Sequence, residues 1–322
     1  MTMKKTIIAT VLALLTVFET SNSVSAQTIY TSLPDPEDKY YQPFKDSLKY
    51  FNQSLQRNAV SEDKFFTLAD QEENFKTKNF YYPDIWLRDV APVVTTRLVK
   101  FQYAPNYLKP KDSHYLNGRF NKFLKSRYRY SKSSLILDGG NLQWNGDQTV
   151  ILTNQVYHDN PDWSKQEIVE ELQDKLNIKH VIIISKEPGD VLGHSDGMVK
   201  FISSHKLFIN DFSYEPGFLK QIEHQIRKQD PEMKFVVLPS AYTSKGQYDK
   251  KIASAKGLYI NMLETKQAIY FPMYGLKSDK KVMQLVAAQT NKKIIPINVG
   301  KISTLGGSIH CLTFDVPDRF AK

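Results

Sequence analysis

The chain has 322 residues, a formal net charge of +9 at pH 7 and one cysteine, Cys311. A single cysteine excludes an intramolecular disulfide framework, so the fold must rest on its apolar core. The positive charge fits either contact with anionic surfaces or solubility alone, and the sequence contains no nucleic-acid-binding module.

The first 26 residues have the pattern of a secretory signal peptide. Two lysines precede the apolar run Thr6–Val17, and the small residues Val24-Ser25-Ala26 offer a cleavage site. The apolar run is too short to span a bilayer stably, and no later stretch is long and apolar enough to anchor the chain. We therefore expect residues 1–26 to be removed, residues 27–322 to form a single domain, and the protein to be periplasmic or secreted.

An amphipathic helix is the first element expected after this segment, because apolar and aromatic residues recur at helical spacing from Tyr40 to Leu55. Pro83 and Pro92 then stiffen a segment that carries Arg88-Asp89, which we expect to lie on a loop and not in a helix. Taken alone, these two residues could be a surface ion pair. The β-branched and aromatic run Val93–Tyr103 predicts a strand directly after them.

Residues 120–128 predict a short helix whose basic side chains are typical of a solvated face. Residues 135–153 then predict a strand, a glycine turn within Asp138-Gly139-Gly140-Asn141, a second strand, a β-turn at Asn145-Gly146 and a third strand.

A helix and a buried strand follow. Ser164 and Glu167 form a capping box in front of a helix that extends to Leu176. The run Val181–Ile184 is apolar at every position, which predicts a strand covered on both faces.

The next motif holds His194 and Asp196 between Gly193 and Gly197. If the segment is extended, both side chains point to one face and Ser195 points to the other. Metal ligation and simple hydrogen bonding compete with catalysis as explanations. No further histidine or carboxylate lies at metal-ligand spacing, so no metal site is predicted.

The remaining elements repeat the same cycle of strands and helices. They are a hairpin over residues 199–210, a helix over 218–226, strands over 235–238, 258–263 and 268–273, a helix over 282–288, and strands over 294–299 and around Cys311. Repeated β-β-α-β blocks predict an α/β fold whose modules are arranged about an axis, with strand ends and loops meeting at the centre.

Cys311 lies in the stretch Gly306–Thr313, after a glycine pair that lets the backbone turn tightly or approach a ligand closely. A lone cysteine is often a small buried apolar residue. The motifs upstream favour a catalytic thiol instead.

These motifs, taken together, resemble the agmatine deiminase and bacterial peptidylarginine deiminase family of the pentein superfamily. The matching stretches are Trp86-Leu87-Arg88-Asp89, Asp138-Gly139-Gly140-Asn141, Gly193-His194-Ser195-Asp196-Gly197-Met198, Tyr259-Ile260-Asn261 with Pro272-Met273-Tyr274-Gly275, and Gly306-Gly307-Ser308-Ile309-His310-Cys311. The resemblance implies a five-bladed α/β propeller of ββαβ modules with a central active site. Agmatine deiminases usually carry Glu where this chain has Asp138.

The implied chemistry is hydrolysis of a guanidinium group. Two carboxylates, Asp89 and Asp196, would hold the cation through paired hydrogen bonds. Cys311 would attack the central carbon as a thiolate, and His194 would protonate the departing ammonia and then activate water. The product is a ureido compound, and no metal or organic cofactor is required.

Other residues are expected to contact the substrate or to orient the site. Trp86 could stack on the guanidinium or pack in the core. Asp138 and Asn261 could orient groups in the site or satisfy turns. His310 should point away from the Cys311 sulfur and serve packing or hydrogen bonding, because neighbours on a strand face opposite sides.

Several functions remain open at this point. The same groups could transfer an amidino group to an amine, hydrolyse a methylated arginine, or form the pocket of a non-catalytic arginine-binding exported protein. A papain-like protease is disfavoured because its cysteine comes near the start of the chain. The substrate could be agmatine, free arginine or arginine in peptides, and no nucleic-acid partner or stable membrane anchor is expected.

Overall fold

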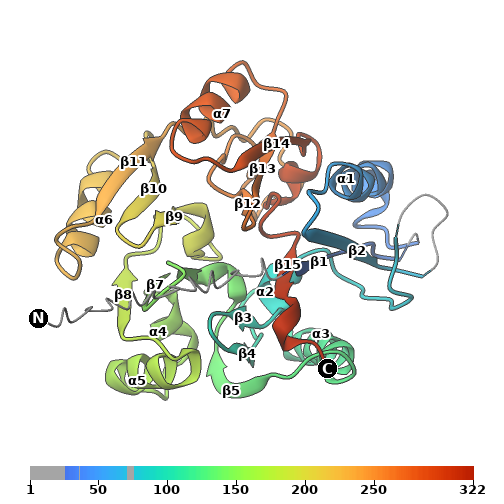
Figure 1. Ribbon diagram of the computed structural model, residues 1–322, viewed down its shortest axis with the longest axis horizontal. Helices are drawn as coiled ribbons and strands as arrows, with labels where there is room; N and C mark the ends of the chain where they lie inside the picture. The colour runs from blue at the N-terminus through green and yellow to red at the C-terminus, as the bar shows by residue number, and fades with distance from the viewer. Residues whose placement is uncertain (1–25, 36, 71–75) are drawn as a thin grey trace, which may run out of the picture.

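The computed structural model describes residues 26–35, 37–70 and 76–322, so nearly all of the predicted signal peptide lies outside the described residues. In the described part of the chain, five three-stranded sheets surround a common centre (Figure 1). In each sheet the inner strand is antiparallel to the middle strand, and the middle strand is parallel to the outer one. A helix connects the two parallel strands, which is the crossover that parallel pairing requires.

Four modules follow one another along the chain, each as strand, strand, helix and strand. The first contains β3 Val93–Val94, β4 Leu98–Gln102, α3 Pro110–Lys125 and β5 Ser131–Ile136. The second contains β6 Gln143–Trp144, β7 Thr149–Thr153, α5 Lys165–Leu176 and β8 His180–Ile184. The third contains β9 Val199–Ser203, β10 Lys206–Asn210, α6 Phe218–Arg227 and β11 Lys234–Leu238. The fourth contains β12 Leu263–Glu264, β13 Ala268–Met273, α7 Asp279–Ala287 and β14 Lys293–Asn298.

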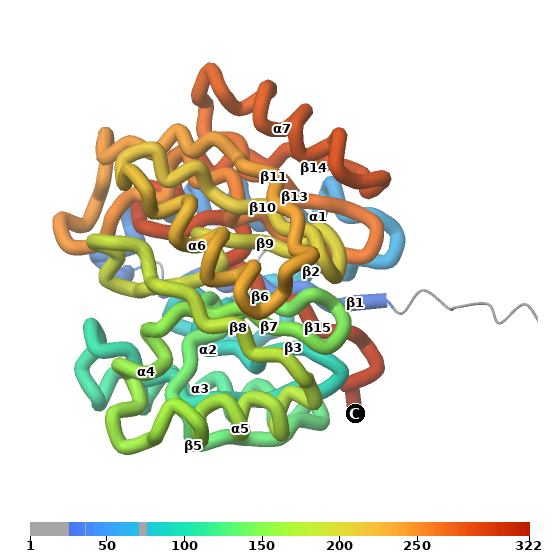
Figure 2. The backbone as a smooth tube through the Cα atoms, turned by 90° about the vertical axis from the view of Figure 1, so that its left-hand side faces the viewer, coloured from blue at the N-terminus to red at the C-terminus, as the bar shows by residue number. Residues whose placement is uncertain are grey.

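The fifth module joins the two ends of the chain. Its inner strand is β15, Phe314–Pro317, which pairs with β1, Gln27–Ser32; α1, Lys45–Arg57, then leads to β2, Asp63–Leu68. Tyr30 lies opposite Phe314 in this pairing, and Figure 2 shows the blue β1 beside the red β15. The predicted β-β-α-β repeat is therefore confirmed, whereas neither β1 nor β2 was predicted.

Short elements connect the modules. They are α2 Leu87–Val90, α4 Gln155–Asp159 and the 3₁₀ turns η1 Gln42–Phe44, η2 Gly139–Asn141, η3 Ser195–Gly197, η4 Ile302–Leu305 and η5 Asp318–Phe320.

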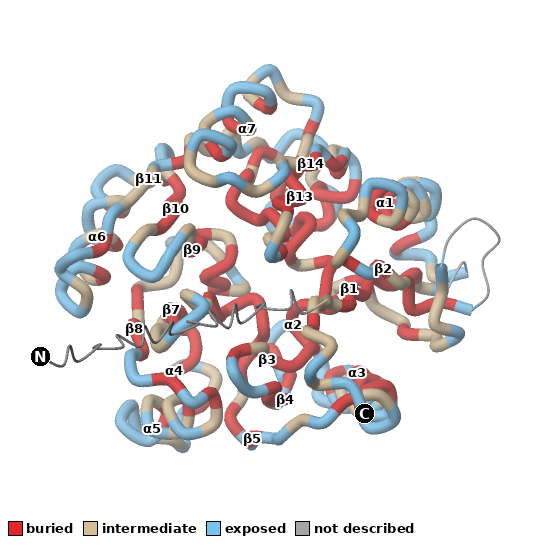
Figure 3. Tube along the Cα trace, viewed as in Figure 1, coloured by how far each residue is buried: buried red, intermediate tan, exposed pale blue. Residues whose placement is uncertain are grey.

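Apolar packing fills the space between the sheets and their outer helices. Figure 3 shows buried residues on the strands and on the inward faces of the helices, with exposed residues on the periphery. Phe120 and Phe123 of α3, for example, pack with Tyr30 and Phe314 of the closing sheet. Among the described residues, no helix combines the length and the apolar character needed to cross a bilayer.

The predicted helix start at Ser164 is confirmed. The Glu167 backbone N–H donates to Ser164 Oγ at 3.2 Å, and the Ser164 N–H donates to Glu167 Oε2 at 2.7 Å. This reciprocal pair satisfies two of the N–H groups that a helix start leaves open.

Several predicted boundaries were wrong. The helix predicted over residues 120–128 is α3, Pro110–Lys125, on the periphery; others lie next to the centre of the ring. Residues 93–103 form a hairpin and not one strand, because the Thr95 N–H donates to the Arg97 carbonyl and turns the chain. Arg88-Asp89 lies in the single-turn helix α2, and His194 to Gly197 enters η3 instead of extending.

The predicted strands at 258–263 and around Cys311 are also corrected. Within residues 258–264 only Leu263–Glu264 forms a strand, and Cys311 lies in a turn before β15. In both places the chain bends and presents polar side chains at the ring centre. A hydrogen bond closes each bend: the Asn261 N–H donates to the Leu258 carbonyl, and the Thr313 N–H donates to the His310 carbonyl.

Candidate active site

The predicted site residues occupy equivalent positions in the five modules. Each lies in the short turn that directly precedes the inner strand of a module. Because the inner strands surround the same axis, their starting ends bring these turns together at one end of the ring. The residues placed there are Asp89 before β3, Asp138 and Asn141 before β6, His194 and Asp196 before β9, Asn261 before β12, and Cys311 before β15.

Cys311 is held by residues of two other modules. Its Sγ lies 3.6 Å from Asp196 Oδ2 and 3.2 Å from Asn261 Nδ2, and its backbone N–H donates to Asn261 Oδ1 at 3.4 Å. The residue is partly exposed. Burial of the sulfur, followed by the charges of Asp196 and Asp89, raises the pKa of the thiol well above its usual value. The free site therefore holds a neutral thiol, and a bound cation would favour the thiolate.

Asp196 is paired with His310. His310 Nδ1 lies 2.7 Å from Asp196 Oδ2. Burial and the nearby Arg88 guanidinium lower the pKa of His310 to about 4. His310 is consequently neutral at pH 7, and its Nδ1–H donates to an ionised Asp196 carboxylate.

His194 lies between two other carboxylates. Its Nδ1 is 3.6 Å from Asp89 Oδ1, and its Nε2 is 3.2 Å from Asp138 Oδ2. Burial opposes the charged form, but Asp89 and Asp138 outweigh it and raise the pKa of His194 to about 10. The imidazole is therefore protonated at neutral pH and carries a proton that it can donate.

Asp89 carries an acceptor atom that the folded chain leaves open. Asp89 Oδ1 is buried and accepts no hydrogen bond from the residues that the structure describes. Burial raises the pKa of Asp89 to about 8; the His194 charge opposes this rise, and the charges of Asp138 and Asp196 add to it. A buried acceptor that has an ion pair with His194 but no hydrogen bond is costly in a native protein, and a ligand with N–H donors would satisfy it.

Two glycines, which have no Cβ, make room for the side chains of the site. A Cβ on Gly140 would lie 2.7 Å from Asp89 Oδ1 and 2.8 Å from His194 Nδ1. A Cβ on Gly307 would collide with the ring of Trp86 and would lie 3.0 Å from Cys311 Cβ. Trp86 thus packs against the turn that carries Cys311, as a wall of the site.

The structure brings all the sequence-predicted site residues into this region, and their catalytic roles stay predictions. Sequence reasoning missed Asp190, whose Oδ2 accepts from the N–H of Gly193 at 2.9 Å and of His194 at 3.3 Å and so fixes the His194 turn. Its position in an Asp-x-x-Gly turn is a signal that could have identified it. It also missed the ion pair of Arg88 with Asp315, at 2.5 Å.

Among the described residues, no group of three or more His, Cys, Asp or Glu side chains is arranged to hold a metal ion.

Comparison with known proteins agrees with this architecture. Residues 24–317 match the family of Porphyromonas-type peptidyl-arginine deiminases. The chain is 23% identical over 222 residues to a protein named "Putative agmatine deiminase" from Latilactobacillus sakei subsp. sakei, which covers 60% of this chain and 61% of that protein. The chain spans about 60% of the length of the curated relatives that it matches.

Solved structures share the fold over most of the chain. The agmatine deiminase of C. jejuni superimposes with a TM-score of 0.73 at 19% identity, covering 91% of this chain and 94% of that one. The agmatine deiminase of Enterococcus faecalis gives a TM-score of 0.67 at 18% identity, covering 92% and 94%. The five sheets and these neighbours confirm the pentein fold, and the family match extends over nearly the whole chain, so the chain belongs to the Porphyromonas-type peptidyl-arginine deiminase family.

Proposed function

We propose that this protein hydrolyses a guanidinium group to a ureido group and ammonia, with Cys311 as a covalent nucleophile. The observation that carries the proposal is the Cys311 thiol 3.6 Å from the Asp196 carboxylate, in a site that also holds the open Asp89 Oδ1 and the His194 imidazolium.

Binding would begin at the carboxylates. A guanidinium is planar and presents N–H donors in a fork, which matches carboxylate oxygens. Asp89 would ionise when the cation enters, because an opposite charge lowers the pKa that burial has raised. Asp196, held by His310, would accept a second pair of N–H groups and place the central carbon near the sulfur.

The first chemical step would form a bond between Cys311 Sγ and the guanidinium carbon. The bound cation lowers the raised pKa of the Cys311 thiol, which releases its proton to solvent and attacks as the thiolate. His194 donates its proton to the leaving nitrogen, and ammonia departs as the C–N bond breaks. The result is an amidino-thioether on Cys311.

The second step would hydrolyse that intermediate. His194, now neutral, takes a proton from water as the oxygen attacks the same carbon. The C–S bond breaks, the thiolate returns and the ureido product leaves. One water is consumed for each ammonia released, and the scheme uses no metal or organic cofactor.

The substrate class is the least specified part of this proposal. The relative from Latilactobacillus sakei and the two solved structures compared above are named for agmatine, other similar structures are named for arginine or peptidyl-arginine, and the family is named for peptidyl-arginine. The signal-peptide pattern in residues 1–26 leads us to propose export, which favours peptidyl or scavenged arginine over a metabolite made inside the cell. Agmatine, free arginine and arginine peptides are therefore the three substrates to compare.

The test is ammonia release from the three substrates by the purified protein and by Cys311→Ala. The native protein should release ammonia and form a ureido product in equal amounts, and the folded variant should release none. A similar solved structure is a cysteine-to-serine variant of the C. jejuni agmatine deiminase with substrate bound, which supports Cys311→Ala as a form that can still bind substrate. Ammonia release by folded Cys311→Ala contradicts covalent catalysis, and an amidino-amine product indicates transfer to an amine.

A further inference from the structure

A second cavity lies at the other end of the ring, away from Cys311. Its volume is about 590 Å³, and the hairpin turns of the modules form its walls. Each of four modules contributes a residue in or beside the turn between its inner and its middle strand: Val94, Gly146, Ser203 and Lys266. Because the site residues precede the inner strands and the turns follow them, the cavity and the active site occupy opposite ends.

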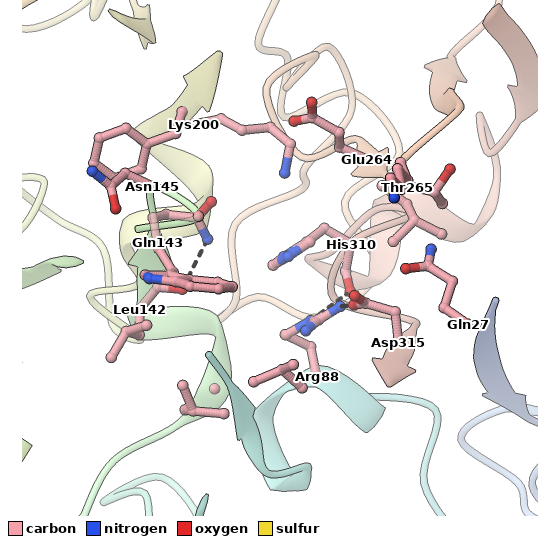
Figure 4. Close-up of a pocket in the computed structure, with 18 of the residues that line it drawn as sticks. Gln27, Arg88, Leu142, Gln143, Asn145, Lys200, Glu264, Thr265, His310 and Asp315 are labelled. Carbon is pink, nitrogen blue, oxygen red and sulfur yellow. Dashed lines mark hydrogen bonds and ion pairs between the residues drawn. The ribbon is translucent and has the colours of Figure 1, made fainter. Parts of the chain in front are cut away.

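A layer of paired residues separates the two. Arg88 and His310 line the cavity, and Arg88 is paired with Asp315 at 2.5 Å. None of the cavity-lining residues in the described part of the chain is Cys311, Asp89, His194 or Asp196. The cavity is therefore a distinct site on the far side of His310 (Figure 4).

One buried cation in the cavity lacks a partner. Lys292 is paired with Glu264 at 2.7 Å, and Arg88 with Asp315, so both carboxylates of the wall are already engaged. Lys200 on β9 is only 8% exposed. No residue that the structure describes forms a hydrogen bond or an ion pair with its ammonium group, and Figure 4 shows this side chain extending into the cavity.

Burial of the side chain lowers the pKa of Lys200, and the charges of Glu264, Asp315 and Asp196 oppose this shift without forming an ion pair with the ammonium. A chain that only needed to fill this position could do so with an apolar side chain. An anion bound in the cavity would supply the missing charge. Gln143 and Ser203 also line the cavity. One amide N–H of Gln143 donates to the Leu142 carbonyl at 3.0 Å (Figure 4), which leaves its second N–H for a ligand.

We propose that this cavity binds a small oxyanion of the phosphate or carboxylate class, with Lys200 as its central charged ligand. The acidic active site at the other end would repel the same anion, which makes the two sites chemically distinguishable. This inference stands on the cavity alone and does not depend on the proposed deiminase activity.

The test is anion binding by the purified protein, measured by isothermal titration calorimetry and by thermal denaturation. Sodium phosphate and sodium succinate are titrated separately at pH 7, in Bis-Tris chloride of constant ionic strength. At least one anion should bind saturably at one site and raise the melting temperature. Binding of phosphate alone would assign the site to phosphate-class anions, and binding of succinate alone would assign it to carboxylates.

Variants of two lysines in the same sheet isolate the site. Lys200→Met should weaken binding at least tenfold, and Lys200→Arg, which keeps the charge, should bind within a few-fold of the native protein. Lys234→Met on the outer strand β11 removes an exposed lysine and should bind normally. Should Lys200→Met fail to fold, Lys200→Gln serves in its place.

Two results overturn the proposal. One is the absence of saturable binding of either anion to the native protein. The other is a result showing that Lys200 is not specifically required. Either Lys200→Met binds as tightly as the native protein, or Lys200→Met and Lys234→Met lose binding equally, which would assign the binding to general surface charge.

Discussion

At the scale of single residues, two histidines of one site differ in charge because their neighbours differ. His194 lies between Asp89 and Asp138, which raise its pKa to about 10 against the effect of burial. His310 is buried beside Arg88 and Lys200, and its pKa falls to about 4. At neutral pH His194 can therefore donate a proton, whereas His310 can only hold Asp196 through its Nδ1–H.

This difference leads to separate expectations for the two alanine variants. His194→Ala should lose about 10²–10⁴-fold in kcat, as expected for loss of a general acid and base, and should accumulate an amidino adduct on Cys311 detectable by intact mass. His310→Ala should keep most of kcat and raise KM, because Asp196 loses a hydrogen-bond donor. Steady-state kinetics on the folded variants measure both effects. If His310→Ala is inactive and His194→Ala has normal activity, His310 and not His194 is the general acid and base.

The raised pKa of Asp89 predicts a pH dependence of substrate capture. Below about pH 8 the free carboxyl is protonated, and the cation must displace that proton before the charge-assisted bond can form. The value of kcat/KM should therefore rise steeply with pH below 8, where both Asp89 and the Cys311 thiol must ionise, and less steeply above it, where only the raised pKa of the thiol still limits the reaction. A profile that is flat from pH 6 to 8 would show that Asp89 is ionised in the free protein.

Asp89→Asn tests the same carboxylate directly. It should lower kcat/KM by an amount equivalent to about 1.5–3 kcal/mol, the usual contribution of a hydrogen bond to a charged group. It should also make the rise of the pH profile below pH 8 less steep, since only the Cys311 thiol then remains to be ionised. Asp147→Asn is the matched control, because Asp147 is exposed in the turn between β6 and β7. Equal effects of the two substitutions would mean that Asp89 does not contact the substrate.

At the scale of elements, the turns before the inner strands decide where the functional groups lie. Gly140 lies against two of these functional groups, since an added Cβ would lie 2.7 Å from Asp89 Oδ1 and 2.8 Å from His194 Nδ1. Such distances force one or both side chains to move, and misplacement of about 1 Å can reduce a rate about 10²-fold.

Gly140→Ala should accordingly lose about 10²-fold or more in kcat/KM while the sheets remain folded. Gly118→Ala in α3 is the control, because nothing lies within 4 Å of its added Cβ and alanine stabilises a helix by about 1 kcal/mol over glycine. The two variants are compared by circular dichroism, melting temperature and ammonia release. Full activity in Gly140→Ala would show that the site tolerates the displacement.

The sequence allowed prediction of elements whose signal is local. Helical spacing predicted α1, the Ser164 and Glu167 pattern predicted the start of α5, and apolar runs predicted β8 and β13. The site residues Asp89, His194, Asp196 and Cys311 were predicted from their motifs, and the structure places them in one region.

The features that sequence reasoning missed depend on contacts between distant residues. His310 and Asp196 are separated by 114 positions yet form a hydrogen bond. A local sequence pattern cannot predict a contact between residues so far apart in the chain. The turns before β9 and β15 were predicted as extended, because β-branched and apolar residues around them favour strands until the ring geometry bends the chain. The cavity around Lys200 was missed for the same reason, since five modules contribute to it.

At the scale of the whole molecule, the ring is closed by the two ends of the chain. The pairing of β1 with β15 places Tyr30 opposite Phe314, and their rings stack at a centroid distance of 6.0 Å. Phe120 of α3 approaches the same Phe314 ring at 5.8 Å, so the closing sheet also packs on the first module. Cys311 lies three residues before Phe314, and closure of the ring therefore also positions the proposed nucleophile.

Phe314→Ala should therefore affect stability and activity together. Removing a fully buried phenylalanine leaves a cavity and costs about 3–5 kcal/mol. The melting temperature should fall, and ammonia release should fail at the same lower temperature, because the turn that holds Cys311 loses its support. Tyr115→Ala in α3 removes an aromatic ring that is 52% exposed and should change neither. If Phe314→Ala melts earlier but stays active up to the native inactivation temperature, the closing sheet supports the fold without positioning Cys311.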